Sequence, residues 1–283
     1  MSLMARLAFA LPRLEPVPNW KFGNWNDRDP RAQVRQRLWW WAHRRGYDGP
    51  VTTNWYLGQK INHHLAGDIS FCTYVDGRYE PNEMHAVAST LRPGMCFVDV
   101  GANAGLFTLL AAAAVGPSGA VHAFEPSPRE RAHLQSNIEL NSLKNVHVYP
   151  VALGSAAQTA SLSVSDREHP GQNTLGGFSY RETSQAYSIE VSVETLDQVV
   201  ERESVNRIDL MKIDVEGSET AVIRGASAAL RRFRPVIIAE ANETALSQMG
   251  SNTNELLDLI RSQGYEVQPF ETGSMNVICH PRK

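Results

Sequence analysis

Hydrophobic and polar positions alternate regularly from about residue 94 to the end of the chain. Short apolar runs, the first at 96–100, are followed by longer stretches in which apolar residues recur at helical spacing. Strands that alternate with helices in this way predict a doubly wound α/β sheet. The other expected strands are 120–125, 146–151, 208–214, 236–240, 265–270 and 275–279. The expected helices are 80–91, 103–115, 127–141, 194–202, 218–230 and 254–262.

One stretch departs from this alternation. Residues 160–164 and 188–193 alternate in period two, and the polar, glycine-rich stretch 166–184 lies between them. This pattern predicts a β-hairpin insertion with a long loop. We expect the loop, through His169, Gln172 and Asn173, to contribute to ligand recognition, the alternative being a plain solvent loop.

Residues 1–93 differ in character and predict an N-terminal, mostly helical and aromatic-rich extension or lid, separate from a main domain at 94–283. The tryptophans of this extension are Trp20, Trp25, Trp39, Trp40, Trp41 and Trp55. The run 39–41 belongs either to a helix whose aromatic side chains pack onto the main domain or to a surface that stacks on carbohydrate or a partner. The adjacent His63 and His64 are poorly placed to chelate one ion, and we expect them in a surface turn.

Composition narrows the class of protein. A chain of 283 residues with a net charge of -3 fits one large domain with an extension and gives no electrostatic case for a nucleic-acid partner. Cys72, Cys96 and Cys279 are widely spaced, which favours a reduced, cytoplasmic protein without a disulfide framework or structural zinc. The apolar runs are too short for a membrane span or a convincing signal peptide.

The most informative segment is 97–105, Phe-Val-Asp-Val-Gly-Ala-Asn-Ala-Gly. An apolar strand with an acid near its end, a glycine turn and a helix start is typical of a cofactor-binding strand–loop–helix. Asn103 occupies the position where a dinucleotide loop needs glycine, and Asp99 puts negative charge where a diphosphate would lie. Glu125, twenty residues beyond Gly105, is placed to reach a ribose. The pattern favours S-adenosylmethionine, which has a ribose and a cationic amino-acid end.

Each residue of this unit has an expected role. Asp99 would face the amino-acid end of the cofactor through water or backbone groups, and Glu125 would bind the ribose diol. Gly101 and Gly105 would permit the tight turn and close helix packing, while Asn103 would adopt a left-handed backbone or donate to the cofactor. The predicted cofactor-binding residues are Asp99, Gly101, Asn103, Gly105, Glu125, Pro126 and Ala152.

Further acids follow later strands. Asp214 ends the strand 208–214 and Glu216 follows it, while Glu240 ends the next strand. Ligands of open α/β sheets bind outside the carboxyl ends of the strands, so these acids are the predicted catalytic residues. They could serve as general base, as acceptors for sugar hydroxyls or as ligands of a divalent cation. We predict no metal site, because no single cluster has diagnostic ligand spacing, and Asp214 is the first choice for the base.

Several segments taken together resemble the FkbM family of S-adenosylmethionine-dependent methyltransferases: 97–105, 123–126, 137–141, 194–197 and 211–217. The resemblance spans roughly residues 75–240. It implies a class I methyltransferase fold, a Rossmann-like sheet of seven strands with the last one antiparallel. It also implies methylation of a hydroxyl oxygen on a small-molecule acceptor such as a carbohydrate or polyketide. The alternatives are a catalytically silent S-adenosylmethionine-binding module and a nicotinamide-dependent dehydrogenase.

Overall fold

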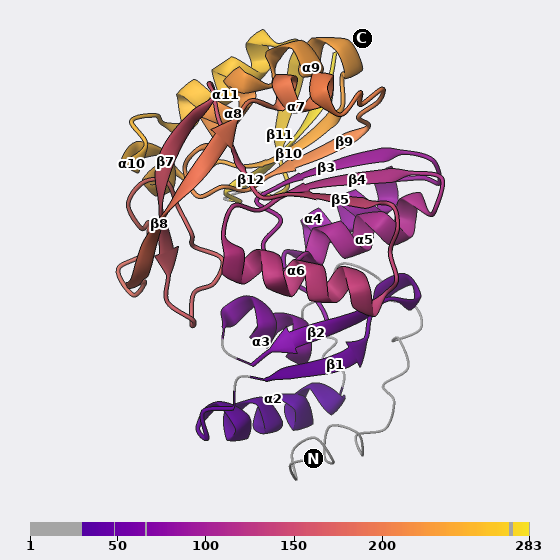
Figure 1. Ribbon diagram of the computed structural model, residues 1–283, viewed down its shortest axis with the longest axis vertical. Helices are drawn as coiled ribbons and strands as arrows, with labels where there is room; N and C mark the ends of the chain where they lie inside the picture. The colour runs from indigo at the N-terminus through magenta and orange to yellow at the C-terminus, as the bar shows by residue number, and fades with distance from the viewer. Residues whose placement is uncertain (1–29, 48, 66, 272–273, 283) are drawn as a thin grey trace.

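A seven-stranded sheet forms the centre of the computed structural model, which describes residues 30–47, 49–65, 67–271 and 274–282 (Figure 1). The strands are β3 (Cys96–Val100), β4 (Ala120–Phe124), β5 (Val146–Tyr149), β9 (Leu210–Ile213), β10 (Val236–Glu240), β11 (Tyr265–Pro269) and β12 (Asn276–Pro281). Their order is β11-β12-β10-β9-β3-β4-β5, and only β12 runs antiparallel to its neighbours. This arrangement confirms the predicted class I methyltransferase fold with an antiparallel last strand.

Helices cover both faces of the sheet, as Figure 1 shows. One face carries α4 (Pro81–Thr90), α5 (Leu106–Val115) and α6 (Pro128–Leu140), and the other carries α7 (Leu196–Arg202), α8 (Glu219–Gly225), α9 (Ser227–Phe233) and α11 (Thr253–Ser262). All five residues of β3 are buried, which explains why its sequence reads as a continuous apolar run. The expected helix 218–230 divides at Ala226 into α8 and α9, and the short α10 (Glu243–Gln248) was not predicted.

The predicted hairpin insertion is confirmed. The strands β7 (Gln158–Ser165) and β8 (Gln185–Glu194) pair antiparallel, and the two-residue β6 (Ala152–Leu153) joins β8 on its other side. The loop between β7 and β8 folds back on the hairpin, because Ser163 and Thr174 form a bridge. This insertion therefore brings residues 166–184 to the carboxyl end of the central sheet (Figure 1).

The described part of the N-terminal extension holds more helix than strand. It consists of α2 (Pro30–His43), β1 (Pro50–Asn54), the 3-10 turn η1 (Tyr56–Gly58), β2 (Lys60–His64) and α3 (Asp68–Val75), followed by α4. The antiparallel hairpin of β1 and β2 was not predicted. Within the described residues, no helix has the length and apolarity that a bilayer crossing requires.

The aromatic and histidine positions of the extension correct two expectations. Trp39 packs edge-on against Phe71 of α3, 5.1 Å between ring centroids, so α2 packs within the extension and not onto the main domain. Trp55 joins the core under α5, Trp40 is 44% exposed, and Trp20 and Trp25 lie outside the described residues. His63 and His64 lie in β2 and not in a surface turn. Strand alternation buries His63, whose ring contacts Thr53 and Thr73.

Two asparagines of α6 attach the extension to the main domain. Asn141 exchanges side-chain hydrogen bonds with the backbone of Lys60, both 2.7 Å long. Asn137 accepts from the backbone amide of Asn62 at 2.8 Å and donates to the carbonyl of Ala104 at 2.9 Å. Because Asn137 contacts both β2 and the loop after β3, the position of the extension is coupled to that loop.

Candidate active site

The loop after β3 and the end of β9 meet without room for a side chain. Gly101 has φ +84°, and a Cβ at this position would lie 1.8 Å from the carbonyl oxygen of Asp214. The amide of Asp214 donates to the carbonyl of Val100 at 3.0 Å, which ties the two strand ends together. Only glycine allows this approach. The local sequence thus fixes the switch point of the sheet, where ligands of this fold class bind.

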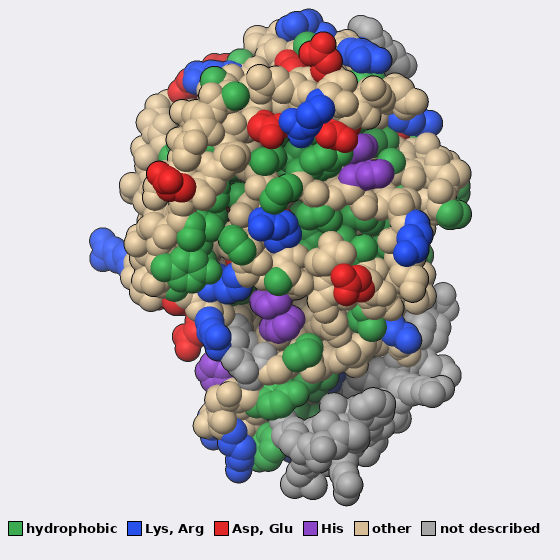
Figure 2. Space-filling view, viewed as in Figure 1, with side chains coloured by type: hydrophobic (Ala, Val, Ile, Leu, Met, Phe, Trp, Pro, Cys, Tyr) green, Lys and Arg blue, Asp and Glu red, His purple; other side chains and the backbone are tan. Residues whose placement is uncertain are grey.

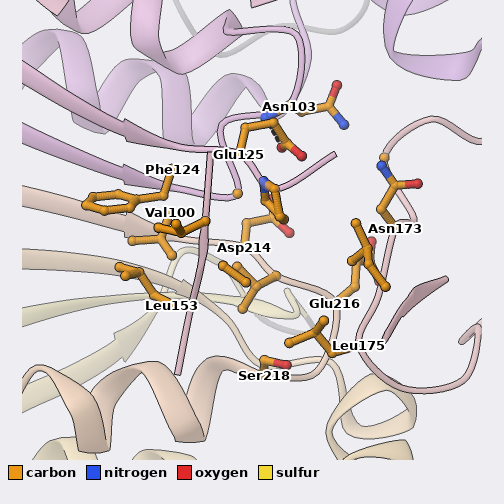
Figure 3. A pocket seen from close by; sticks show the side chains of 17 residues that line it. Val100, Asn103, Phe124, Glu125, Leu153, Asn173, Leu175, Asp214, Glu216 and Ser218 are labelled. Carbon is orange, nitrogen blue, oxygen red and sulfur yellow. Dashed lines mark hydrogen bonds between the residues drawn. The ribbon is translucent and has the colours of Figure 1, made fainter. Parts of the chain in front are cut away.

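Glu125 is held by two backbone amides of the same region, as Figure 3 shows in part. The amide of Asn103 donates to one carboxylate oxygen and the amide of Ser127 to the other, both at 2.8 Å. Asn103 has the predicted left-handed backbone, φ +49°, and its side chain donates to the carbonyl of Pro170 at 2.8 Å. Burial, and then the charge of Glu130, raise the pKa of Glu125 to about 8, whereas the two amides favour the ionised form.

An apolar cleft opens beside Glu125 (Figure 3). Its lining includes Val100, Phe124, Pro126, Val151, Ala152, Leu153, Leu162 and Leu175, with Asn173 and Ser218 at its polar positions. A slot with mostly apolar walls and the Glu125 carboxylate beside them suits a planar ring joined to a diol. The predicted residues Gly101, Asn103, Glu125, Pro126 and Ala152 all line this apolar cleft.

Asp99 and Gly105 lie elsewhere, which corrects the expectation that Asp99 faces the ligand. Asp99 is fully buried and accepts a hydrogen bond from the Thr108 hydroxyl of α5 at 2.5 Å, because strand alternation turns its side chain toward that helix. Burial raises its pKa to about 6 against the opposing charge of Lys212. Gly105 lets α5 approach α6, since a Cβ there would lie 2.5 Å from Leu134.

A cavity of about 530 Å³ adjoins the apolar cleft, and we call it the acidic cavity. It is lined by Asp68, Ile69, Tyr79, Glu80, Gly101, Ala102, Asn103, Ala104, Leu106, Phe107, Gly171, Gln172, Tyr180, Lys212, Asp214, Glu216, Glu240, Ser274, Met275 and Asn276. Its volume falls in the usual range for small-molecule sites. Gly101, Asn103, Gly171, Asp214 and Glu216 line both spaces.

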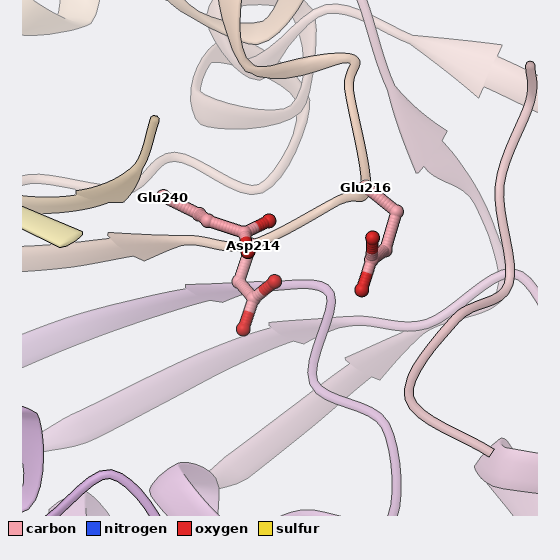
Figure 4. Close-up of side chains that lie close together, drawn as sticks. All are labelled: Asp214, Glu216 and Glu240. Atoms are coloured by element: carbon pink, nitrogen blue, oxygen red, sulfur yellow. The ribbon is translucent and has the colours of Figure 1, made fainter. Parts of the chain in front are cut away.

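The three predicted catalytic acids come together in this cavity (Figure 4). Oxygens of Asp214, Glu216 and Glu240 lie within 4.8 Å of one another, close enough to hold a metal ion. Chain spacing could not reveal this cluster, because Glu240 comes from the neighbouring strand β10. Burial, and then the charge of Asp214, raise the pKa values of Glu216 and Glu240 well above the usual range of a carboxyl group.

Lys212 supplies the positive charge in this cluster and was not among the predicted site residues. Its Nζ lies 2.6 Å from Asp214 Oδ2 and 3.6 Å from Glu80 Oε2, and 4.4 Å from the centre of the Phe107 ring. Burial disfavours the ammonium form, but the charges of Asp214 and Glu80 outweigh that effect and raise its pKa. The sequence did contain a signal for Lys212, since alternate residues of a strand lie on the same face of the sheet. A lysine two residues before Asp214 in an apolar strand is therefore expected beside that acid.

Glu80 and the insertion loop complete the site. Glu80 precedes α4 and has its pKa raised to about 7 by burial, with Lys212 opposing the shift. No local pattern marks Glu80 as a site residue, since it reaches the cavity from the extension. Of the loop residues, Gln172 lines the acidic cavity and Asn173 the apolar cleft. His169 instead pairs with Asp166 at 2.9 Å.

No capping box forms between Ser127 and Glu130 at the start of α6. The Ser127 hydroxyl donates to the Glu130 carboxylate and does not accept from the helix backbone. The reason is that the Ser127 amide is already engaged by Glu125, so Glu130 cannot cap it. Glu219 plays a related supporting part after β9, where its carboxylate accepts from the amides of Val215 and Gly217.

Comparison with curated proteins gives relatives that share part of this chain. It is 28% identical over 213 residues to AMB antimetabolite synthetase AmbE of Pseudomonas aeruginosa, covering 62% of this chain and 10% of that protein. It is 32% identical over 146 residues to methyltransferase 1 of Beauveria bassiana, covering 45% and 57%. It is 30% identical over 202 residues to the 31-O-demethyl-FK506 methyltransferase FkbM of Streptomyces tacrolimicus, covering 62% and 75%. The chain thus spans a tenth and just over half of the first two relatives.

Among solved structures, the crystal structure of methyltransferase FkbM from Methylobacillus flagellatus KT is similar with a TM-score of 0.44 and 14% identity, covering 74% of this chain and 52% of that one. A family model described as the methyltransferase FkbM domain matches residues 99–267, which is more than half of the 283 residues. The chain therefore belongs to the FkbM family of S-adenosylmethionine-dependent methyltransferases, and S-adenosylmethionine is its cofactor.

Proposed function

We propose that this methyltransferase methylates a hydroxyl oxygen of a small molecule, such as a sugar or polyketide, bound in the acidic cavity. The observation that carries the proposal is the convergence of Asp214, Glu216 and Glu240 at the carboxyl ends of β9 and β10. Carboxylates accept hydrogen bonds from hydroxyl groups, and a cavity of about 530 Å³ accommodates a small molecule. The similarity to a 31-O-demethyl-FK506 methyltransferase supports oxygen as the methylated atom.

The apolar cleft fits the nucleoside end of the cofactor. A carboxylate has about four lone-pair sites, and the two backbone amides use two of those on Glu125, so two remain for a ribose diol. Phe124, Pro126 and Ala152 border the apolar space for the base. Gly101 and Asn103, which line both spaces, would hold the amino-acid end. Asp99 and Gly105 support that loop from beneath, through α5.

When bound, S-adenosylmethionine supplies a methyl group on a positively charged sulfur. Orientation of the acceptor is the main task of the protein, and positioning alone contributes about 7–11 kcal/mol to such reactions. Asp214 is the proposed base or hydroxyl-orienting group, because Lys212 fixes its carboxylate in place. The proton that the hydroxyl loses passes to the Asp214 carboxylate. Glu216 and Glu240 have raised pKa values that keep them protonated near neutral pH, so they can donate hydrogen bonds to the acceptor. A positioned base contributes on the order of 10²–10⁴-fold.

The test is a screen of hydroxylated acceptors with methyl-labelled S-adenosylmethionine, followed by the variant Asp214→Asn. We expect kcat to fall on the order of 10²-fold or more, while the affinity for S-adenosylhomocysteine in calorimetry stays near that of the wild type. Asp258→Asn removes an acid that is 74% exposed on α11 and is the matched control. Near-normal turnover of Asp214→Asn would refute its role, and methylation confined to nitrogen acceptors would refute the hydroxyl.

Chelation of metal ions shows whether the three acids act on the acceptor directly or bind a divalent cation. Lys212 already supplies a cation at 2.6 Å from Asp214, so we expect EDTA to leave turnover unchanged. Turnover that disappears with EDTA and returns with Mg²⁺ would instead assign the three carboxylates to a divalent cation.

A further inference from the structure

A cavity of about 140 Å³ with basic side chains adjoins the acidic cavity, and we call it the basic pocket. The strand β2, helices α3 and α6 and the insertion loop form its walls. Its titratable lining residues are His64, Arg129, His133 and Arg167, and no carboxylate is among the described residues that line it. In Figure 2, histidine and basic side chains gather where α6 faces β2 and α3. Ile69, Asn103 and Ala104 line both cavities, so the two spaces are neighbours.

Arg129 is held rigidly and retains an unused donor. Its Nε lies 2.6 Å from the Glu130 carboxylate, and its Nη1 donates to the carbonyl of Ser165 at 2.8 Å. The remaining Nη2 is buried and has no hydrogen-bond partner. An unsatisfied buried guanidinium nitrogen is unfavourable, and an oxyanion offers the matching acceptor oxygens. Arg129 is therefore preorganised to bind a negatively charged oxygen group.

Two stacked histidines form part of the wall of the pocket. The rings of His64 and His133 are stacked with centroids 3.6 Å apart and planes 16° apart. Burial first, and then the charges of His64, Arg129 and Arg167, lower the pKa of His133 to about 4. Each of these groups acts as a positive neighbour on His133. An anion in the pocket would offset this repulsion.

We propose that the basic pocket binds an oxyanion, a phosphate, sulfate or carboxylate group, carried by the methyl acceptor itself. This inference rests on the proposed function. Lys212, the cation among the described residues that line the acidic cavity, is already paired with Asp214 and Glu80, whereas Arg129 of the basic pocket has a donor without a partner. One acceptor spanning both spaces would therefore be held in a single direction. The acceptor class is accordingly a hydroxylated compound with an anionic substituent, such as a sugar phosphate or a hydroxy acid.

The first measurement uses inorganic phosphate and sulfate as probes of the full chain saturated with S-adenosylhomocysteine. We expect calorimetry to detect binding in the wild type and affinity lower by at least about tenfold in Arg129→Gln. Because Arg129 also holds Glu130, Arg167→Gln at an exposed loop position is the second variant and should weaken binding in the same direction. Arg231→Gln on α9, on the opposite face of the sheet, is the control for charge. Equal binding in all four proteins, or none in the wild type, would overturn the proposal.

The second measurement identifies the source of the oxyanion. Matched acceptors with and without a phosphate, sulfate or carboxylate group are compared by kcat/KM. We expect Arg167→Gln to lower kcat/KM more for the anionic member than for the neutral one, so that the preference falls. If Arg167→Gln instead weakens S-adenosylhomocysteine and leaves the acceptor preference intact, the pocket serves the cofactor carboxylate and the proposal fails. If no hydroxyl is methylated at all, the proposed function fails, while phosphate binding still reports on the pocket.

Discussion

The apolar cleft and the acidic cavity share five lining residues but are constructed in different ways. Backbone geometry defines the cleft, through the close approach of Gly101 to Asp214 and the two amides that hold Glu125. Charged side chains define the cavity, where four acids surround Lys212 or lie beside it. The cleft should therefore be sensitive to steric changes in the main chain, and the cavity to changes in charge.

The difference also appears in the stability of the two regions. The cleft buries apolar surface, which favours folding. The cavity buries several carboxyl groups, and burial raises the pKa of Glu80 to about 7 and those of Glu216 and Glu240 further. Raised carboxyl pKa values mean that ionisation destabilises the folded state. A site that destabilises the fold is commonly retained for function.

The largest effect is expected when a methyl group is inserted between the two regions. In Gly101→Ala the new Cβ would lie 1.8 Å from the Asp214 carbonyl oxygen, at a residue with a positive φ. We therefore expect the unfolding free energy to fall by more than about 3 kcal/mol. We also expect the variant to lose cofactor binding. Gly250→Ala is the control, because Gly250 also has a positive φ, +73°, but open space around its Cβ position. Thermal unfolding with and without S-adenosylhomocysteine measures both quantities. Similar stability of the two variants would contradict the steric account of the cleft.

The next effect tests the charge balance of the cavity. Lys212→Met leaves Asp214, Glu80 and Asp99 without their buried cation, and we expect about 3 kcal/mol of destabilisation at pH 8. The loss should shrink toward pH 5, because Glu80 and Asp99, with pKa values near 7 and 6, become protonated. Lys144→Met at an exposed position is the control. A loss that does not depend on pH would mean that packing on Phe107, and not charge, is the main role of Lys212.

The cleft could be predicted from sequence because its parts are local. Gly101, Asn103 and Glu125 belong to one strand–loop–helix–strand unit, whose apolar periodicity and turn residues are visible in the chain. The prediction that the Asp99 side chain faces the cofactor was wrong. An acidic residue at the end of a strand does not by itself show on which face of the sheet its side chain lies. In this protein that face is toward α5, where Thr108 binds it.

The cavity could be predicted only in part, because it is assembled from distant segments. Asp214 and Glu240 follow from the rule that ligands bind at the carboxyl ends of strands. Glu80 enters from the extension and Gln172 from the insertion, and their arrival depends on tertiary contacts such as those of Asn137 and Asn141 with β2. The unpredicted β1–β2 hairpin is the element that makes these contacts, so the basic pocket beside it was equally hidden.

A smaller effect is expected at the carboxylate of the cleft. Glu125→Gln keeps the size of the side chain but replaces an acceptor oxygen with an NH2 donor, so a hydroxyl hydrogen bond that contributes about 0.5–1.5 kcal/mol is lost. We therefore expect affinity for S-adenosylhomocysteine to fall by up to about tenfold, with the acceptor KM unchanged. Calorimetry measures the first quantity and initial rates at saturating cofactor the second. Glu139→Gln on the exposed side of α6 is the control, and unchanged cofactor affinity would remove Glu125 from the ribose site.

The smallest effect concerns stability and depends on pH. Burial raises the pKa of Glu240 from the ordinary 4.5 of a glutamate to about 10, so between these pH values the folded protein keeps a proton that the unfolded chain releases. The wild type must then lose stability as pH rises through this window, at most by about 1.4 kcal/mol per pH unit from this one group. Glu240→Gln binds no proton in either state and lacks this slope. We expect the variant to be more stable than the wild type by about 1 kcal/mol at pH 8 and by less at pH 5, as measured by thermal unfolding beside the exposed control Glu266→Gln. A variant that is less stable at pH 8 would indicate that ionised Glu240 stabilises the cavity, and the charge account of this region would fail.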